Sequence, residues 1–138
     1  MYNVIMINYT DELRRHNLKA TPQRLAISDA LHRYGHVNID ALYEMMLKKF
    51  SSISLATIYK NINIMLANSY IQEVKVPYTK SVYELTKNHH SHLICTQCGE
   101  VEDIKLSIKP LLDDVVNNSD FNISKADIVI SGFCKNCQ

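Results

Sequence analysis

Two cysteine pairs, Cys95-x-x-Cys98 and Cys134-x-x-Cys137, place the strongest constraint on how this chain of 138 residues can fold. Because 35 residues separate the pairs, a shared site would tie the end of the chain back to its middle. Four thiolates with no open position suit one tetrahedral Zn(II) ion. Two disulfides or a thioredoxin-like redox pair are the alternatives, but neither pair lies at a strand-to-helix junction near a chain start. The spacing therefore favours a structural zinc site.

The opening segment M-Y-N-V-I-M-I-N-Y-T is apolar, yet it has no basic n-region and charged residues follow it at once. We expect neither a signal peptide nor a membrane span, and hence a cytoplasmic protein whose thiols stay reduced. Residues 1–80 carry ten Lys and Arg against six Asp and Glu, whereas residues 81–138 carry five against eight. A basic front half and an acidic back half rich in metal ligands indicate two functional halves, the first of them suited to nucleic acid.

Helix signals fill the front half. Thr21-Pro22 offers a capping hydroxyl and a proline at the first helical position, and Gly35 is a natural stop. Asn38 can cap a second helix, and a third begins at Ser54. A short leading helix is expected over residues 11–16.

From Ile71 the spacing of the apolar residues is no longer helical. Residues 74–76 and 81–85 are expected to be strands joined by a turn over 77–80. Three helices followed by such a hairpin is the order of a winged helix-turn-helix module, whose third helix enters the major groove of DNA. The back half is expected to contain strands over 92–95, 99–104 and 123–130 and a helix over 107–116.

The histidines near the first cysteine pair form a different set of ligands. In an extended segment His90 and His92 share one face, and the carboxylates of Glu84 and Asp103 are near in sequence. Mixed nitrogen and oxygen ligands favour an exchangeable ion such as Fe(II), Mn(II) or Zn(II). A solvated histidine cluster without metal is the alternative.

Six short motifs occur in an order that is jointly specific. They are L18-K-A-T-P-Q-R24, G35-H36, I53-S-L-A-T-I-Y59, Y83-E84, H89-H-S-H-L-I-C-T-Q-C-G99 and C134-K-N-C137. With these motifs the chain resembles the ferric uptake regulator family of metal-dependent repressors over nearly its whole length. The resemblance implies an α+β fold: a winged-helix DNA-binding domain over residues 1–84, a hinge over 85–91, and an α/β dimerisation domain over 92–138 that carries the structural zinc.

The resemblance also implies a homodimer in which each chain holds one structural Zn(II) and one regulatory Fe(II) or Mn(II). The regulatory ligands carried over are His36, Glu84, His90, His92 and Asp103. A metal that needs His36 from one domain and two histidines from the other would fix the angle between domains, and thus the spacing of the two recognition helices. Metal would then bias the equilibrium towards a closed, DNA-binding dimer.

Within the family, the peroxide-stress regulators are the most similar branch, because their last ligand is aspartate, as Asp103 is here. The function implied is repression that is relieved when Fe(II) and peroxide oxidise a ligand histidine. Glu84 departs from the best-known peroxide sensors, which have aspartate there. The alternative is an iron- or zinc-availability sensor of the same family that binds and releases its ion reversibly.

The partner that the resemblance implies is double-stranded operator DNA, expected to be an A/T-rich inverted repeat, with peroxide as a signal and no membrane partner. Tyr59 on the third helix is expected to contact a base, although core packing is the alternative for this side chain. The other expected DNA contacts are Lys60, Asn61, Thr57, Arg24 and Lys19. If the metal ligands served an enzyme, the winged-helix domain would have no function, so we expect no enzymatic activity.

Overall fold

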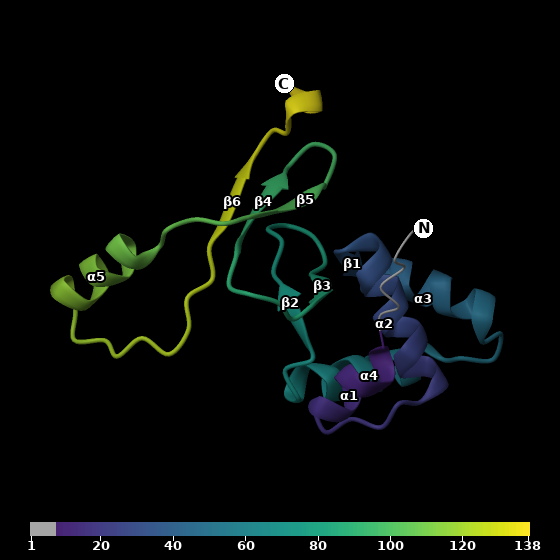
Figure 1. The fold of residues 1–138 in the computed structure, drawn as a ribbon. Coiled ribbons are helices and arrows are strands. Elements are labelled where there is room, and N and C mark those ends of the chain that lie inside the picture. Colours follow the sequence, from purple (N-terminus) through teal and green to yellow (C-terminus); the bar gives the residue numbers. More distant parts are fainter. Residues whose placement is uncertain (1–7) are drawn as a thin grey trace, which may run out of the picture. The chain divides into compact units, whose positions relative to one another are not determined.

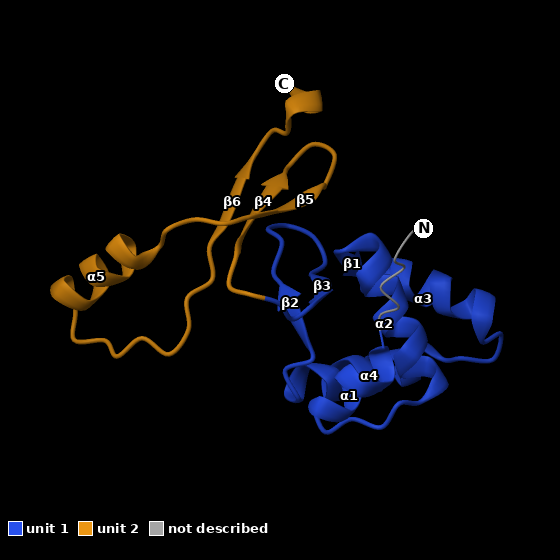
Figure 2. Ribbon diagram, viewed as in Figure 1, with its two compact units in different colours: residues 1–87 blue, residues 88–138 orange. Residues whose placement is uncertain are grey.

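The computed structural model describes residues 8–138 and divides the chain into two compact units, residues 1–87 and 88–138 (Figures 1 and 2). The elements of unit 1 are α1 (Tyr9–Arg15), α2 (Pro22–Tyr34), β1 (Val37–Asn38), α3 (Ile39–Lys49), α4 (Leu55–Ala67), β2 (Ile71–Val74) and β3 (Val82–Leu85). Those of unit 2 are β4 (Ser91–Cys95), β5 (Val101–Ile104), α5 (Lys109–Asn118), β6 (Val129–Gly132) and the short 3-10 helix η1 (Lys135–Cys137).

Most of the apolar opening segment, on which the expectation of no signal peptide rests, lies outside the described residues. Within residues 8–138, no helix is long and apolar enough to cross a membrane.

Polar side chains start each helix of unit 1 by accepting a backbone hydrogen bond, which satisfies an N–H that the helix itself leaves open. Thr21, Asn38 and Ser54 each accept from the N–H three residues ahead, at 3.3, 2.8 and 3.1 Å. Gly35 ends α2 with φ +75°, a left-handed conformation that costs glycine little. The predicted helix starts and the predicted stop are confirmed. The leading helix begins two residues earlier than predicted, because Asn8 caps it.

Unit 1 contains the hydrophobic core of the chain. The apolar stripe of α4, Ile58, Ile62 and Met65, is fully buried. It belongs to one cluster with side chains of the other three helices, among them Leu13, Ile27, Leu31, Leu42 and Met46. Fully burying one such side chain contributes about 1.5–3 kcal/mol. The packing of the four helices therefore has a large source of stability that involves no metal.

Strands β1, β3 and β2 form an antiparallel sheet in that order, with β3 in the middle. The predicted strand over residues 74–76 is wrong, because β2 runs from Ile71 to Val74. Ile71 and Val74 are the buried residues of this strand and pair with β3, whereas Pro77 has no N–H to donate to a ladder. The two residues of β1 were not predicted, since so short a strand leaves no alternating pattern.

The sheet of unit 2 has the order β5-β4-β6, with β4 antiparallel to β5 and parallel to β6. The strands predicted over 92–95 and 99–104 and the helix predicted over 107–116 are confirmed within about two residues. The strand predicted over 123–130 is wrong in its extent. Its pairing with β4 starts at His92↔Val129, and the carbonyl of Ile128 accepts a hydrogen bond from the N–H of His92 at 3.1 Å, so residues 123–127 lie outside the sheet.

Unit 2 has little core of its own. Among the described residues, Ile94 and Cys95 are the only buried hydrophobic side chains of this unit. Helix α5 has no buried residue, and Figure 1 shows it apart from the sheet, between two extended segments. Its side chains Leu111, Val115 and Val116 are exposed. The predicted α+β fold class is confirmed, but unit 2 needs stabilisation from outside its own packing.

Candidate metal centres

The two cysteine pairs meet at one end of the sheet of unit 2. Cys95 is the last residue of β4 and is paired with Gly132 at the end of β6. Cys134 follows Gly132 after two residues and Cys137 after five, so the chain carries both to the same place. The first pair bends in a tight turn, where Gly99 donates its N–H to the carbonyl of Cys95 at 2.9 Å. The parallel pairing of β4 with β6 thus converts a separation of 35 residues into a cluster.

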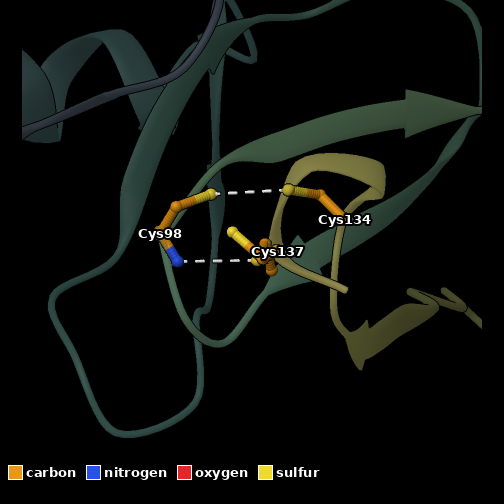
Figure 3. Close-up of side chains that lie close together, drawn as sticks. Cys98, Cys134 and Cys137 are labelled. Carbon is orange, nitrogen blue, oxygen red and sulfur yellow. Dashed lines mark hydrogen bonds between the residues drawn. The ribbon is translucent and has the colours of Figure 1, made fainter.

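The four sulfur atoms have the separations of a closed zinc site. All lie within 4.8 Å of one another, and none is in a disulfide. Figure 3 shows the thiols of Cys98, Cys134 and Cys137 directed at a common point, with 3.8 Å between the sulfurs of Cys98 and Cys134. Sulfurs about 2.3 Å from one tetrahedral Zn(II) are about 3.8 Å apart. The chemistry and the spacing of the four sulfurs fit a tetrahedral Zn(II) site.

The protonation of these thiols also points to a cation. Backbone hydrogen bonds from Cys134 and Cys98 lower the pKa of Cys95 to about 6, which favours its thiolate. Hydrogen bonds to the sulfurs of Cys134 and Cys95 raise the pKa of Cys137 to about 12, because they favour the protonated thiol of Cys137. A bound divalent ion would displace the remaining thiol protons and offset the charge of four adjacent thiolates.

Unit 1 holds a histidine beside a buried carboxylate. His36 immediately precedes β1, and Glu84 lies on β3, the strand with which β1 pairs. The Nε2 atom of His36 is 2.8 Å from Oε2 of Glu84, whose side chain is 1% exposed. The other carboxylate oxygen accepts a hydrogen bond from the side-chain amide of Gln72 on β2. An imidazole and a carboxylate at this distance offer two ligands for a cation.

Unit 2 holds two histidines around one aspartate. His92 on β4 is the cross-strand partner of Asp103 on β5. The Nε2 atoms of His90 and His92 are each 3.4 Å from Oδ1 of Asp103, and the two imidazole rings are 4.5 Å apart. The Nδ1 atom of His90 is 2.8 Å from the carbonyl oxygen of Asn88. Since a carbonyl only accepts, a neutral His90 carries its proton on Nδ1 and presents the Nε2 lone pair on the side of Asp103.

The candidate DNA-contacting residues lie on or near α4. Tyr59 is 41% exposed, so its ring is not part of the core, and Lys60 is exposed beside it. Arg24 connects α2 with α4, because its Nε donates to Oδ1 of Asn61 at 3.1 Å. A second guanidinium nitrogen donates to the carbonyl of Lys19 at 3.1 Å. Thr57 accepts the amide of Asn61 on its carbonyl, at 3.1 Å.

Sequence reasoning missed Gln72. Gln72 can be recognised from its cross-strand pairing with Glu84. A first hairpin strand over residues 74–76 does not include Gln72 and so does not predict this pairing. The four cysteines, the pair in unit 1 and the trio in unit 2 all come from residues that the sequence had already singled out.

The chain is similar to known proteins in both sequence and structure. The model of the ferric uptake regulator family matches residues 15–131. The chain is 33% identical over 131 residues to the peroxide-responsive repressor PerR of Staphylococcus saprophyticus, a match that covers 91% of this chain and 86% of that protein. Among solved structures it resembles the Campylobacter jejuni peroxide stress regulator, with 34% identity, a TM-score of 0.70, and 95% of this chain and 100% of that chain covered.

The fold is also similar to that of the Vibrio cholerae ferric uptake regulator (Fur), with 27% identity, a TM-score of 0.75, and 92% of this chain and 100% of that chain covered. The family match spans both units and includes α4 and all the candidate ligands except Cys134 and Cys137. The chain therefore belongs to the ferric uptake regulator family, and it is a metal-dependent transcriptional regulator and not an enzyme.

Proposed function

We propose that this regulator is a repressor that binds operator DNA when a regulatory cation is bound and leaves it when peroxide oxidises a ligand histidine. The observation that carries the proposal is the division of the ligands between the two units. His36 and Glu84 belong to unit 1, whereas His90, His92 and Asp103 belong to unit 2. Neither set is complete alone, so a cation bound by all five would link the units.

The chemistry of these ligands suits Fe(II) or Mn(II). Three imidazoles and two carboxylates form a borderline, mixed nitrogen and oxygen set, and such sets hold exchangeable ions. The binding free energy favours whichever arrangement of the two units brings all five ligands to one ion. Metal therefore acts as an effector that shifts a pre-existing equilibrium between arrangements.

DNA recognition would follow from that arrangement. We propose that α4 enters the major groove, with Tyr59 contacting a thymine methyl group and the neighbouring backbone. Lys60 and Lys19 would bind phosphates, and Arg24, held by Asn61, would fix the orientation of α4 on the backbone. An A/T-rich inverted repeat is the proposed operator, because a twofold dimer reads two half-sites at fixed spacing.

A homodimer formed through unit 2 is part of the proposal. Helix α5 has no buried residue and exposes Leu111, Val115 and Val116, which are the kind of side chains that obligate dimers cover. One structural Zn(II) per chain, held by the four cysteines, would keep the sheet of unit 2 in place to pair with its partner.

The proposed response to peroxide uses the same ligands. Bound Fe(II) would catalyse the oxidation of a ligand ring by hydrogen peroxide. One peroxide oxygen would be inserted into a ring C–H of His36 or His90, and the other would leave as water. The oxidised ring would then be a poorer ligand. Asp103 matters because its short side chain leaves room for peroxide. The 33% identity with a peroxide-responsive repressor supports this reading.

A second candidate is a sensor of iron or zinc availability in the same family, which acts by reversible binding alone. Glu84 favours it, since the longer carboxylate stands where aspartate occurs in the best-known peroxide sensors. The similarity to the Vibrio cholerae ferric uptake regulator is compatible with it as well.

Mass spectrometry of the Fe(II)-loaded protein after equimolar peroxide separates the two. The peroxide proposal predicts a gain of one oxygen on a peptide containing His36 or His90, together with loss of DNA binding in a gel shift. The Mn(II)-loaded protein is the control and should gain none. Unoxidised histidines and retained DNA binding in the Fe(II) form would favour the availability sensor.

A further inference from the structure

The carboxylate of Glu84 has two different partners within unit 1. Its Oε2 is 2.8 Å from His36 Nε2, and its Oε1 accepts a hydrogen bond from the side-chain amide of Gln72. A carboxylate can bind a cation through one oxygen or through both. Which mode it adopts depends on what holds the second oxygen.

The backbone fixes Gln72 in the position to hold that oxygen. Gln72 and Glu84 are directly opposite each other on β2 and β3, so their side chains lie on the same face of the sheet. Ile71, next to Gln72, is 2% exposed and belongs to the core of unit 1. The amide is therefore anchored to a packed element and not to a loop.

We propose that Gln72 is the positioning residue that makes Glu84 a one-oxygen ligand of the regulatory cation. The inference rests on the proposed function, in which Glu84 is a ligand. Gln72 holds Oε1 and turns Oε2 to the side of His36, so the carboxylate is oriented before metal arrives. Such pre-orientation raises metal affinity, because less freedom is lost on binding.

This role of Gln72 explains how residue 84 can be a glutamate in a peroxide-reactive site. A freely rotating glutamate can reach a cation with both oxygens and fill a coordination position that peroxide needs. With Oε1 held by Gln72, Glu84 offers one oxygen, as a shorter aspartate would. A peroxide-reactive site is then compatible with glutamate at this position, provided that residue 72 supplies the hydrogen bond.

The test measures Mn(II) binding, and no peroxide is needed. Gln72→Leu removes the donor and Gln72→Thr keeps a polar residue too short to reach Oε1. The matched control is Glu73→Gln, which changes the next residue of β2 on the opposite face. Each protein keeps its zinc, and the readouts are the Mn(II) dissociation constant from dye competition and the Mn(II) electron paramagnetic resonance spectrum.

We expect both Gln72 variants to weaken Mn(II) binding by about tenfold and to change the zero-field splitting of bound Mn(II), while Glu73→Gln alters neither. A Glu84→Asp background separates positioning from general stability, because the shorter carboxylate is beyond the reach of the Gln72 amide. There, Gln72→Leu should have no further effect on the dissociation constant.

Wild-type affinity and spectrum in Gln72→Leu would overturn the inference. An equal loss in the Glu84→Asp background would also overturn it, because Gln72 would then act through the fold. If the wild-type chain bound no second metal at all, the proposed function would fail and take this inference with it.

Discussion

Replacing Cys137 by Ser, or removing zinc with a chelator, is expected to unfold unit 2 and to leave unit 1 folded. Among the described residues of unit 2, Ile94 and Cys95 are the only buried hydrophobic side chains, and full burial contributes about 1.5–3 kcal/mol for each such side chain. A structural zinc contributes about 10–16 kcal/mol. A loss of this size matches or exceeds the whole stability of a typical domain, about 5–15 kcal/mol. Unit 1 retains its packed core of four helices.

Hydrogen–deuterium exchange read by mass spectrometry measures both units in one sample. Without zinc, the amides of β4, β5 and β6 should exchange at the rate of an unfolded chain, while those of α2, α3 and α4 keep their protection. Adding zinc back to the chelated wild type should restore protection in unit 2 but not in Cys137→Ser. The matched control is Gln97→Ser, an exposed change in the same turn that removes no sulfur. Persistent protection of β4 in the zinc-free protein would refute this reasoning.

Three other predictions follow from single contacts. Ser28→Ala should lower the free energy of unfolding of unit 1 by about 1–3 kcal/mol in urea, because the buried hydroxyl of Tyr70 donates to Ser28 Oγ at 2.7 Å and would lose its acceptor. An equal loss in a Tyr70→Phe background would contradict this. Burial raises the pKa of Tyr70 above its ordinary 10.0. The stability that this neutral phenol contributes is therefore present below pH 10 and lost as the pH rises beyond it. Tyr70→Phe should reduce the fall in the free energy of unfolding at alkaline pH. Tyr78→Gly should raise stability by up to about 1 kcal/mol, because the exposed tyrosine adopts φ +63°, which glycine tolerates better; a lower melting temperature would show that the ring supports the turn.

The helices were predictable because their signals are local. Thr21, Asn38 and Ser54 cap the helices that they were expected to cap, since a capping side chain acts within three residues of itself. The cysteine cluster was predictable for another reason. The chemistry of zinc needs four ligands, and the chain has only four cysteines to supply them.

The errors all concern strands, whose limits are set by partners elsewhere in the chain. Residues 123–127 were expected to belong to the closing strand, but β4 begins at Ser91 and has no residues left to pair with them. The first strand of the hairpin was placed too late for the same reason, because its position depends on pairing with Val82 and Leu85. That displacement also concealed Gln72, whose role exists only through its neighbour across the sheet.

The candidate regulatory ligands were predictable in part. Alternation along the segment that leads into β4 correctly put His90 and His92 on one side, and their rings are 4.5 Å apart. Asp103 is opposite His92 because β4 and β5 form a hairpin around the first cysteine pair, which spacing alone suggested. That His36 acts with them remains a prediction, because it depends on how a cation is shared between the units.

That sharing is best tested by the metal dependence of DNA binding in two single variants, one from each unit. Fluorescence anisotropy would follow a DNA duplex selected from a random pool by the Mn(II)-loaded protein, with wild type, His36→Ala and His92→Ala titrated with Mn(II), and with zinc content and dimer mass checked in each. If one cation links the two units, wild-type affinity for DNA rises with Mn(II), and both variants lose that rise while they keep their zinc and their dimer. Unchanged metal dependence in either variant would contradict the account, because that histidine would then play no part in the regulatory site.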